Sequence, residues 1–293
     1  MRKLLAVMLL LTMLIPAALA EDAADYALPI DFPAGHVADP ANFTENSYED
    51  DSLSVQLEQI SQDGVMYNVA RVKVAHASQL RTGLEDPAKG KKSNYVHNIA
   101  EKYNAVLAIS GDFFTKNKVG YVVRMGETYR IKPSKTRDML LIDSNGDFHV
   151  IFRSDAEELQ TLNSRTDVTF PNIFNFGPVL VHEGQALTVP EYYDNTFNVK
   201  RPEPRCAIGQ VGPLEYLLVV ADGRSDDSEG ATAEQLAQFM AAQGCITAYN
   251  LDGGDTALMW FGGDYYSRKT KRSQSDIIYF ATAVDAGLDG TED

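Results

Sequence analysis

The chain has 293 residues, 44% of them hydrophobic, which suits one large globular domain or two small ones. Its 41 acidic residues outnumber its 26 basic residues, and the formal net charge is −15. A surface of this sign repels nucleic acid and anionic membranes, so we expect neither as a partner.

Residues 1–20 have the pattern of a cleavable signal peptide. Arg2 and Lys3 precede an apolar run that is too short to span a bilayer, and Ala18-Leu19-Ala20 fits a signal-peptidase site. An uncleaved anchor is the alternative. Cleavage changes the net charge from −15 to −17, because the segment carries two positive charges and no negative one. We therefore expect a secreted or cell-envelope protein without stable membrane insertion.

The mature chain is predicted to begin with an acidic leader or linker, residues 21–51, and to end in an acidic tail, residues 285–293. Between them, residues 52–284 form the expected folded domain. Alternating apolar residues on both sides of Gln62-Asp63-Gly64 predict a first hairpin. Leu80 to Lys92 is polar and predicts a loop, and a short helix is expected within Asn94 to Tyr103.

A first glycine motif follows a continuous apolar strand, Ala105 to Ser110. The strand ends in Gly111-Asp112-Phe113-Phe114. Ser154 to Leu162 predicts a helix, and paired β-prone runs around glycine turns predict three further hairpins at Gly120 to Arg130, Met139 to Phe152 and Gly177 to Val189.

A second polar cluster begins at Pro204-Arg205-Cys206-Ala207-Ile208-Gly209, which enters another predicted hairpin. The partner strand, Leu214 to Val220, ends in Ala221-Asp222-Gly223-Arg224. An Asp-Gly-Arg sequence therefore directly follows a very apolar strand.

The last motif lies between Gly244 and Met259. Thr232 and Gln235 form a capping-box pattern, and Gly244 is placed to end the helix that they begin. Cys245 to Leu251 then predicts a buried strand that ends in Asp252-Gly253-Gly254-Asp255. The two glycines permit positive φ and a close approach to a ligand, although a plain Asp-Gly hairpin turn explains the pattern too.

The many hairpins and few helices predict an α+β fold: a single domain with a large mixed, mostly antiparallel β-sheet and a few flanking helices. Ala257 to Phe261 and Asp276 to Val284 supply its last strands. The strand-end motifs should converge at one edge if their strands lie side by side in this sheet.

In this order, the four motifs resemble those of the phosphodiester glycosidase family. The matching stretches are Ser110 to Phe114, Pro204 to Gly209, Asp222 to Arg224 and Leu251 to Ala257. The resemblance implies an enzyme that hydrolyses a glycosyl phosphodiester, a sugar-1-phosphate linkage, in a cell-envelope or extracellular polysaccharide or glycoconjugate. The chain departs from the family pattern where Asp112 replaces Gly, where Cys206 replaces Thr, and where Asp255-Thr256-Ala257 replaces Gly-Ser-Ser.

The reaction needs cationic stabilisation of the phosphate and a carboxylate near the anomeric carbon. Arg205 and Arg224 suit the first task, because guanidinium groups bind phosphate in a bidentate manner, although structural ion pairs are the alternative. Asp252 is the candidate nucleophile or base, and Asp222 the second carboxylate or a residue that orients Arg205. Each Asp could instead shape a turn.

Eight further residues are expected to contact the substrate: Gly111, Asp112, Phe114, Asn250, Gly253, Gly254, Asp255 and Thr256. Asn250 could equally be an interior amide bonded to backbone. Asp255 adds negative charge beside Asp252, so it should either help to bind a divalent cation, Ca²⁺ or Mg²⁺, or pair with Arg224. No motif identifies the metal, and the scattered histidines argue against zinc.

Cys206 and Cys245 are the only cysteines. Two buried free thiols are favoured over a disulfide, which an exported chain also permits. Tyr192, Tyr193 and Trp260 are either core residues or sugar-stacking surfaces. Two rival functions remain: a phosphodiesterase that cuts the P–O bond, and a non-catalytic polysaccharide-binding module on the same fold.

Overall fold

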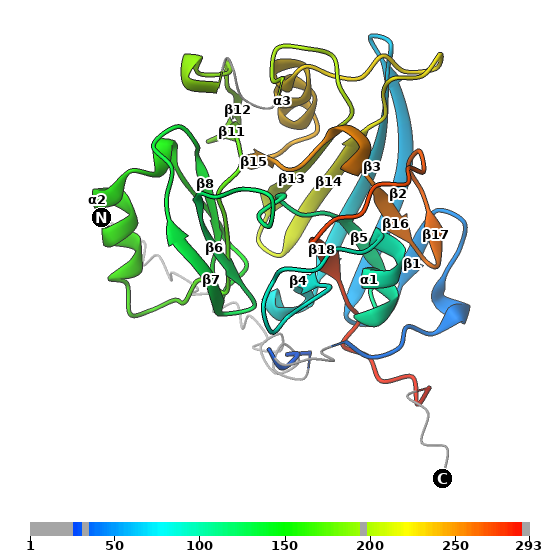
Figure 1. The fold of residues 1–293 in the computed structure, drawn as a ribbon. Coiled ribbons are helices and arrows are strands. Elements are labelled where there is room, and N and C mark those ends of the chain that lie inside the picture. Colours follow the sequence, from blue (N-terminus) through cyan, green and yellow to red (C-terminus); the bar gives the residue numbers. More distant parts are fainter. Residues whose placement is uncertain (1–25, 31–34, 194–197, 289–293) are drawn as a thin grey trace, which may run out of the picture.

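A computed structural model describes residues 26–30, 35–193 and 198–288. Within these ranges the strands form three antiparallel sheets (Figure 1). The large sheet has eight strands, in the spatial order β1 (Ser47–Glu49), β2 (Leu53–Gln62), β3 (Val65–Val74), β14 (Glu215–Ala221), β13 (Arg205–Gly212), β15 (Thr247–Asn250), β11 (Val179–His182) and β12 (Gln185–Ala186).

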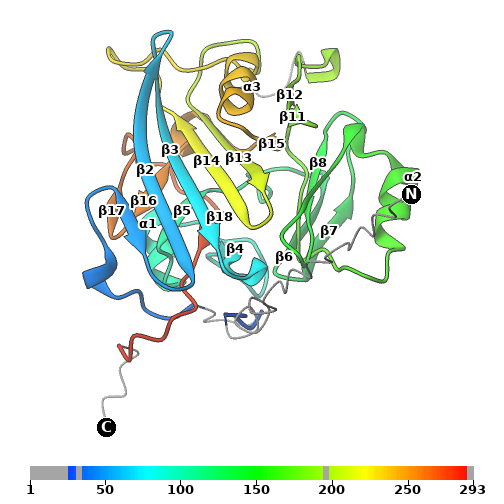
Figure 2. The same cartoon turned by 180° about the vertical axis from the view of Figure 1, so that it is seen from behind.

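The two smaller sheets have five strands each. One runs β7 (Glu127–Lys132), β6 (Gly120–Arg124), β10 (Asn172–Phe174), β8 (Met139–Ile142) and β9 (Phe148–Ile151). The other runs β17 (Asp264–Tyr265), β16 (Met259–Phe261), β5 (Leu107–Ser110), β18 (Asp276–Phe280) and β4 (Leu80–Leu84). Figure 2 shows from behind how the long β2–β3 hairpin extends along the large sheet.

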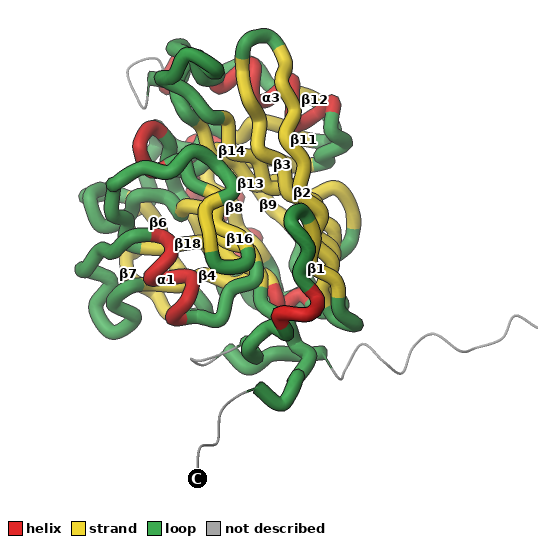
Figure 3. The backbone as a smooth tube through the Cα atoms, turned by 90° about the vertical axis from the view of Figure 1, so that its right-hand side faces the viewer, coloured by secondary structure: helices red, strands yellow, loops and turns green. Residues whose placement is uncertain are grey.

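In the described residues, three α-helices cover the outer faces of the sheets, namely α1 (Val96–Lys102), α2 (Ala156–Asn163) and α3 (Ala233–Ala242). Figure 3 shows two of them, α1 and α3, outside the strands on which they pack. The predicted capping box begins α3: Gln235 N donates to Thr232 Oγ1 at 3.1 Å, and Thr232 N donates to Gln235 Oε1 at 2.9 Å. Short 3₁₀ turns lie at Pro40–Asn42, Ala77–Gln79, Phe152–Ser154, Glu191–Tyr193 and Gly254–Thr256.

The main core lies between the large sheet and both small sheets. It combines Val55 and Leu218 of the large sheet with Ile109 of β5 and Leu140 of β8. A second cluster joins the other face of the large sheet to α3, where the rings of Tyr67 and Phe239 stack at 3.8 Å between centroids. Burial of these apolar faces provides the main driving force for folding.

The prediction of an α+β fold with a large, mostly antiparallel sheet and a few flanking helices is confirmed, and the remaining strands form two smaller sheets. Two local predictions were wrong. Leu80–Leu84 is a fully buried strand rather than a loop, since Arg81 is buried and bonded to Tyr279 and to backbone carbonyls. The expected leader contains β1, whose Tyr48 is 1% exposed in the main core.

The predicted signal peptide, residues 1–20, lies outside the described residues, as do the beginning of the leader and most of the acidic tail. In the part of the chain that the structure describes, no helix is long and apolar enough to cross a membrane.

Candidate active site

Strand register brings three of the four motifs together at one end of the large sheet. In the ladder of β13 and β14, Arg205 pairs with Ala221, so the Asp222-Gly223-Arg224 segment leaves the sheet beside Arg205. In the ladder of β13 and β15, Ala207 pairs with Asn250. The chain after β15 therefore runs past Arg205 as well.

Backbone hydrogen bonds fix the Asp252-Gly253-Gly254 turn against this strand end. Gly254 N donates to Pro204 O at 2.8 Å. A side chain at position 253 would place its Cβ 2.6 Å from Pro204 O, which no real Cβ tolerates, so glycine is required there. Gly254 has φ +63°, a conformation that glycine adopts at little cost.

These segments enclose a cavity of about 180 Å³, which we call the diester cavity. It is lined by Phe176, Asn198, Glu203, Arg205, Arg224, Leu251, Asp252, Gly253 and Gly254. Two arginines and two carboxylates thus meet in one small space. Arg205, Arg224 and Asp252, which come from three different motifs, therefore line one cavity.

Asp252 is a carboxylate of the cavity that neutral groups hold in place. Thr256 Oγ1 donates to its Oδ2 at 2.6 Å, and Gly253 N donates to its Oδ1 at 3.1 Å. Burial raises the pKa of Asp252 to about 7, although these two hydrogen bonds oppose the rise. A carboxyl that titrates near neutral pH can accept or donate a proton at little cost, as acid–base catalysis requires.

Arg205 is held rigidly and is almost fully buried. Its Nε donates to Ala231 O at 2.9 Å, and its Nη2 donates to the carbonyls of Asn198 at 2.7 Å and Arg201 at 2.9 Å. Burial lowers the pKa of Arg205 to about 10, which still leaves the guanidinium charged at neutral pH. These carbonyl partners orient the guanidinium.

Arg224, by contrast, is bound by two carboxylates. Its Nη2 lies 2.7 Å from Glu203 Oε2, and its Nη1 lies 2.9 Å from Asp255 Oδ1. The Asp255–Arg224 pair is one of the two arrangements expected from the sequence. Glu203 was missed by the sequence analysis, although it lies directly before the Pro204-Arg205 motif.

The carboxylate of Asp222 is bonded to Arg268, which differs from the expectation that it orients Arg205. It accepts a hydrogen bond from Arg268 N at 3.1 Å, and burial raises its pKa. Asp222 does not line the diester cavity. It lines a neighbouring pocket instead, which shares Arg224 and Gly254 with the cavity.

The fourth motif reaches the site by a different route from the one expected. Strand β5 belongs to a small sheet and not to the large sheet of β15. The loops after the two strands still touch, since Asp252 N donates to Gly111 O at 3.0 Å. A Cβ at Gly111 would lie 2.3 Å from the Asp276 carboxylate, so this glycine serves packing.

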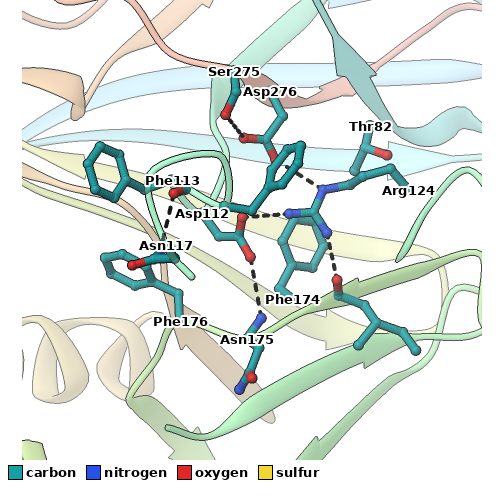
Figure 4. Close-up of polar contacts among 12 residues, drawn as sticks. Thr82, Asp112, Phe113, Asn117, Arg124, Phe174, Asn175, Phe176, Ser275 and Asp276 are labelled. Atoms are coloured by element: carbon teal, nitrogen blue, oxygen red, sulfur yellow. Dashed lines mark hydrogen bonds and ion pairs between the residues drawn. The ribbon is translucent and has the colours of Figure 1, made fainter. Parts of the chain in front are cut away.

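Asp112 points into the protein and is buried in a network that we call the Arg124 triad. Arg124 Nη2 lies 2.6 Å from Asp112 Oδ1, and Arg124 Nε lies 3.0 Å from Asp276 Oδ2 (Figure 4). Asn175 N donates to the other oxygen of Asp112 at 3.3 Å. The expectation that Asp112 contacts the substrate is therefore corrected, because its carboxylate is already occupied.

Other candidates are placed in the protein interior. Phe114 packs with Leu84 and Val122, away from the diester cavity. Asn250 donates from Nδ2 to Gly177 O at 2.8 Å, and within the described residues its buried Oδ1 has no hydrogen-bond partner. The aromatic candidates are structural as well: Trp260 and Tyr193 are core residues, and Tyr192 bonds to Asp138.

No group of three or more His, Cys, Asp or Glu residues in the described part of the chain is arranged to hold a metal ion. The two cysteines are buried and free, as favoured from the sequence. Burial raises the pKa of Cys245 to about 12, and that of Cys206 rises further for the same reason, so neither is a reactive thiolate.

Comparison with known proteins now gives the family. The model of the phosphodiester glycosidase family matches residues 103–281, which are more than half of the chain and include all four motifs.

The chain belongs to the phosphodiester glycosidase family.

Two curated relatives agree with this membership. The SPbeta prophage-derived uncharacterized protein YomE of Bacillus subtilis is 36% identical over 94 residues, which are 32% of this chain and 14% of that protein. The N-acetylglucosamine-1-phosphodiester alpha-N-acetylglucosaminidase of Bos taurus is 24% identical over 208 residues, covering 68% of this chain and 39% of the bovine protein. The chain thus spans well under half the length of either relative.

A solved structure shows the same fold. The catalytic domain of the zebrafish N-acetylglucosamine-1-phosphodiester alpha-N-acetylglucosaminidase, auto-inhibited by its pro-peptide, has a TM-score of 0.60 and 17% identity. The match covers 81% of this chain and 87% of that domain. At this identity the likeness concerns the fold alone.

Proposed function

We propose that this family member is an exported hydrolase that cleaves a glycosyl phosphodiester, a sugar-1-phosphate linkage, in a cell-envelope or extracellular glycoconjugate. The observation that supports the proposal most strongly is the diester cavity. There the oriented guanidinium of Arg205 and the carboxyl of Asp252, whose pKa is about 7, line the same small space. Export is proposed from the signal-peptide pattern of residues 1–20.

Arg205 is the proposed phosphate ligand. Its guanidinium is fixed by backbone carbonyls, so little reorganisation is needed when negative charge develops on the departing phosphate. Arg224 contributes less, because Glu203 and Asp255 already balance its charge. The relative that is named for a sugar-1-phosphodiester substrate supports this choice of substrate class.

Asp252 is the proposed nucleophile or base. As a base, it takes a proton from water while the water oxygen bonds to the anomeric carbon, and the bond from that carbon to the phosphate oxygen breaks. The phosphate monoester leaves as a weak base with a second pKa of about 6, so it needs little protonation by the enzyme. As a nucleophile, Asp252 bonds to the anomeric carbon while the bond from that carbon to the phosphate oxygen breaks, and water then hydrolyses the glycosyl ester, which releases the sugar and restores the carboxyl group.

Hydrolysis of a panel of sugar-1-phosphate diesters in ¹⁸O-labelled water tests the proposal. C–O cleavage puts the label in the released sugar. Label in the phosphate would identify a phosphodiesterase that cuts the P–O bond and would overturn the proposal.

Asp252→Asn separates an enzyme from a binding module. The variant should lose at least about 100-fold in kcat/KM, the usual scale for a positioned acid–base group, while it still binds the substrate. Sugar-phosphate binding by a wild-type protein that turns over none of the diesters would instead identify a non-catalytic module.

A further inference from the structure

A second pocket, unassigned so far, lies next to the diester cavity and carries the opposite charge to the protein as a whole. This basic pocket has a volume of about 260 Å³ and shares Arg224 and Gly254 with the diester cavity. Its lining includes Asp222, Gly223, Asp255 and four cationic side chains, those of Arg224, Arg268, Lys269 and Lys271.

Most of this charge comes from one loop. Residues 268–272 read Arg-Lys-Thr-Lys-Arg, so four of five are cationic in a chain whose formal net charge is −15. The sequence analysis did not single out this segment. Such a concentration of one sign creates a local positive field that attracts anions against the general charge of the protein.

The loop is held over the pocket by specific hydrogen bonds. Arg268 Nη1 donates to Gly223 O and, at 3.1 Å, to Arg224 O, and Thr270 Oγ1 donates to Asp255 O. These bonds tie the loop to both turns that carry the candidate active site. The loop that carries the basic side chains is thereby held beside the diester cavity.

The charge of the pocket is only partly balanced. Asp255 is taken by Arg224, and Asp222 accepts from the backbone N of Arg268. Within the described residues, Arg268, Lys269 and Lys271 have no carboxylate within 4.0 Å, and Lys269 Nζ instead lies 5.0 Å from the centre of the Tyr265 ring. Exposed cations without a carboxylate partner beside a substrate cavity are suited to bind an anion.

We infer that the basic pocket is a subsite for a second phosphate of the substrate. The natural substrate is then a polymer in which sugars are joined through repeated phosphodiesters, so that a neighbouring phosphate lies in the basic pocket while one linkage occupies the diester cavity. This inference rests on the proposed function, and it names the substrate class that the proposed function leaves open.

Kinetics with a matched pair of substrates tests the inference. One substrate is a sugar-1-phosphate diester with an uncharged leaving portion, and the other is a two-repeat oligomer that carries a second phosphate there. In Lys269→Gln/Lys271→Gln, KM for the two-phosphate substrate should rise about tenfold more than KM for the single-phosphate substrate, because two charge-assisted contacts are lost. Lys91→Gln/Lys92→Gln, two exposed lysines outside both pockets, should leave both KM values unchanged.

An equal effect of the variant on both substrates, or no effect, would overturn the inference. If the wild-type protein hydrolyses neither substrate, the proposed function fails, and calorimetric binding then tests the subsite separately. The two-phosphate oligomer should bind at least about fivefold more weakly to the lysine variant than to the wild type, with a steep salt dependence. Unchanged oligomer affinity, or equally tight binding of single-stranded DNA with the same number of phosphates, would reject the sugar-phosphate subsite.

Discussion

Two strand ends of this protein carry a similar sequence of Gly and Asp, but the two carboxylates have different roles. After β5 the chain reads Gly111-Asp112, and after β15 it reads Asp252-Gly253. Asp112 is 2% exposed and bound to Arg124, whereas Asp252 lines an open cavity with a rigid arginine near it. The backbone hydrogen bond from Asp252 N to Gly111 O shows that the two sites are neighbours.

The difference lies in the partner of each carboxylate. The Arg124 triad surrounds one cation with two buried carboxylates, and all three side chains are occupied. In the diester cavity, Arg205 donates to backbone carbonyls and Asp252 accepts from Thr256 and Gly253, and both side chains line the space in which a ligand would bind. A strand-end Asp-Gly therefore indicates a place where chemistry is possible, and nonlocal pairing decides whether it is used.

The largest expected effect concerns the triad. Arg124→Met leaves two carboxylates buried without a cation, and it should reduce the free energy of unfolding by about 3–5 kcal/mol, as measured by urea denaturation. Adding Asp112→Asn and Asp276→Asn to this variant should restore part of the loss. A change below about 1 kcal/mol for the single variant would show that the triad is not a structural ion pair network.

Arg205 should behave in the opposite way, with a smaller effect that falls mainly on activity. Arg205→Lys replaces a planar fork with a point charge and should cost roughly 2–4 kcal/mol in transition-state stabilisation, measured as kcat/KM on a sugar-1-phosphate diester. Arg201→Lys is the matched control, since only the backbone of Arg201 contacts Arg205. Activity of Arg205→Lys within twofold of the wild type would make Arg205 peripheral.

The raised pKa of Asp252 should make the stability of the folded protein depend on pH. Its pKa is raised by folding from 3.8 to about 7, so the folded state favours the protonated form and loses stability as pH rises from about 4 to about 7. Asp252→Asn removes that loss and should be more stable than the wild type by roughly 1–3 kcal/mol at pH 8, with the advantage shrinking toward pH 4. Thermal unfolding across this range measures it, with exposed Asp226→Asn as the control. A constant difference across pH would contradict the shifted pKa.

The smallest effect is expected at Asp255, whose ion pair with Arg224 is half exposed. Asp255→Asn should change stability by less than about 1 kcal/mol, because exposed ion pairs contribute little. The uncovered charge of Arg224 should move the acidic limb of the pH–rate profile downward by a few tenths of a unit, and a chelator should change nothing. Loss of activity on chelation in the wild type alone would favour a cation at Asp255 instead.

Local signals explain what the sequence predicted well. The capping box and terminal glycine of α3 are short-range features, and the strand that follows is read from consecutive apolar residues. The contact between Arg224 and Asp255 was likewise one of two options left by simple electrostatics. The helix signals and the ion pair could both be predicted from residue type, without knowledge of the tertiary structure.

The incorrect predictions all concern contacts between segments that are far apart in the sequence. Nothing in the order of the strands shows that β5 and β15 belong to different sheets, because pairing partners come from distant segments. Strand β4 was predicted as a loop because it contains the polar residue Arg81. Arg81 can be buried only because Tyr279 and backbone carbonyls from distant parts of the chain bond to it. For the same reason Asp112 looked like a substrate ligand until Arg124 and Asp276 were placed around it.

The two buried thiols offer a built-in reporter of how this molecule opens. Cys206 belongs to the core between the sheets, and Cys245 to the core under α3, on the opposite face of the large sheet. A thiol reagent can reach each one only when its own layer separates. The order in which the two cysteines are labelled under native conditions would therefore show whether the core between the sheets or the core under α3 opens first.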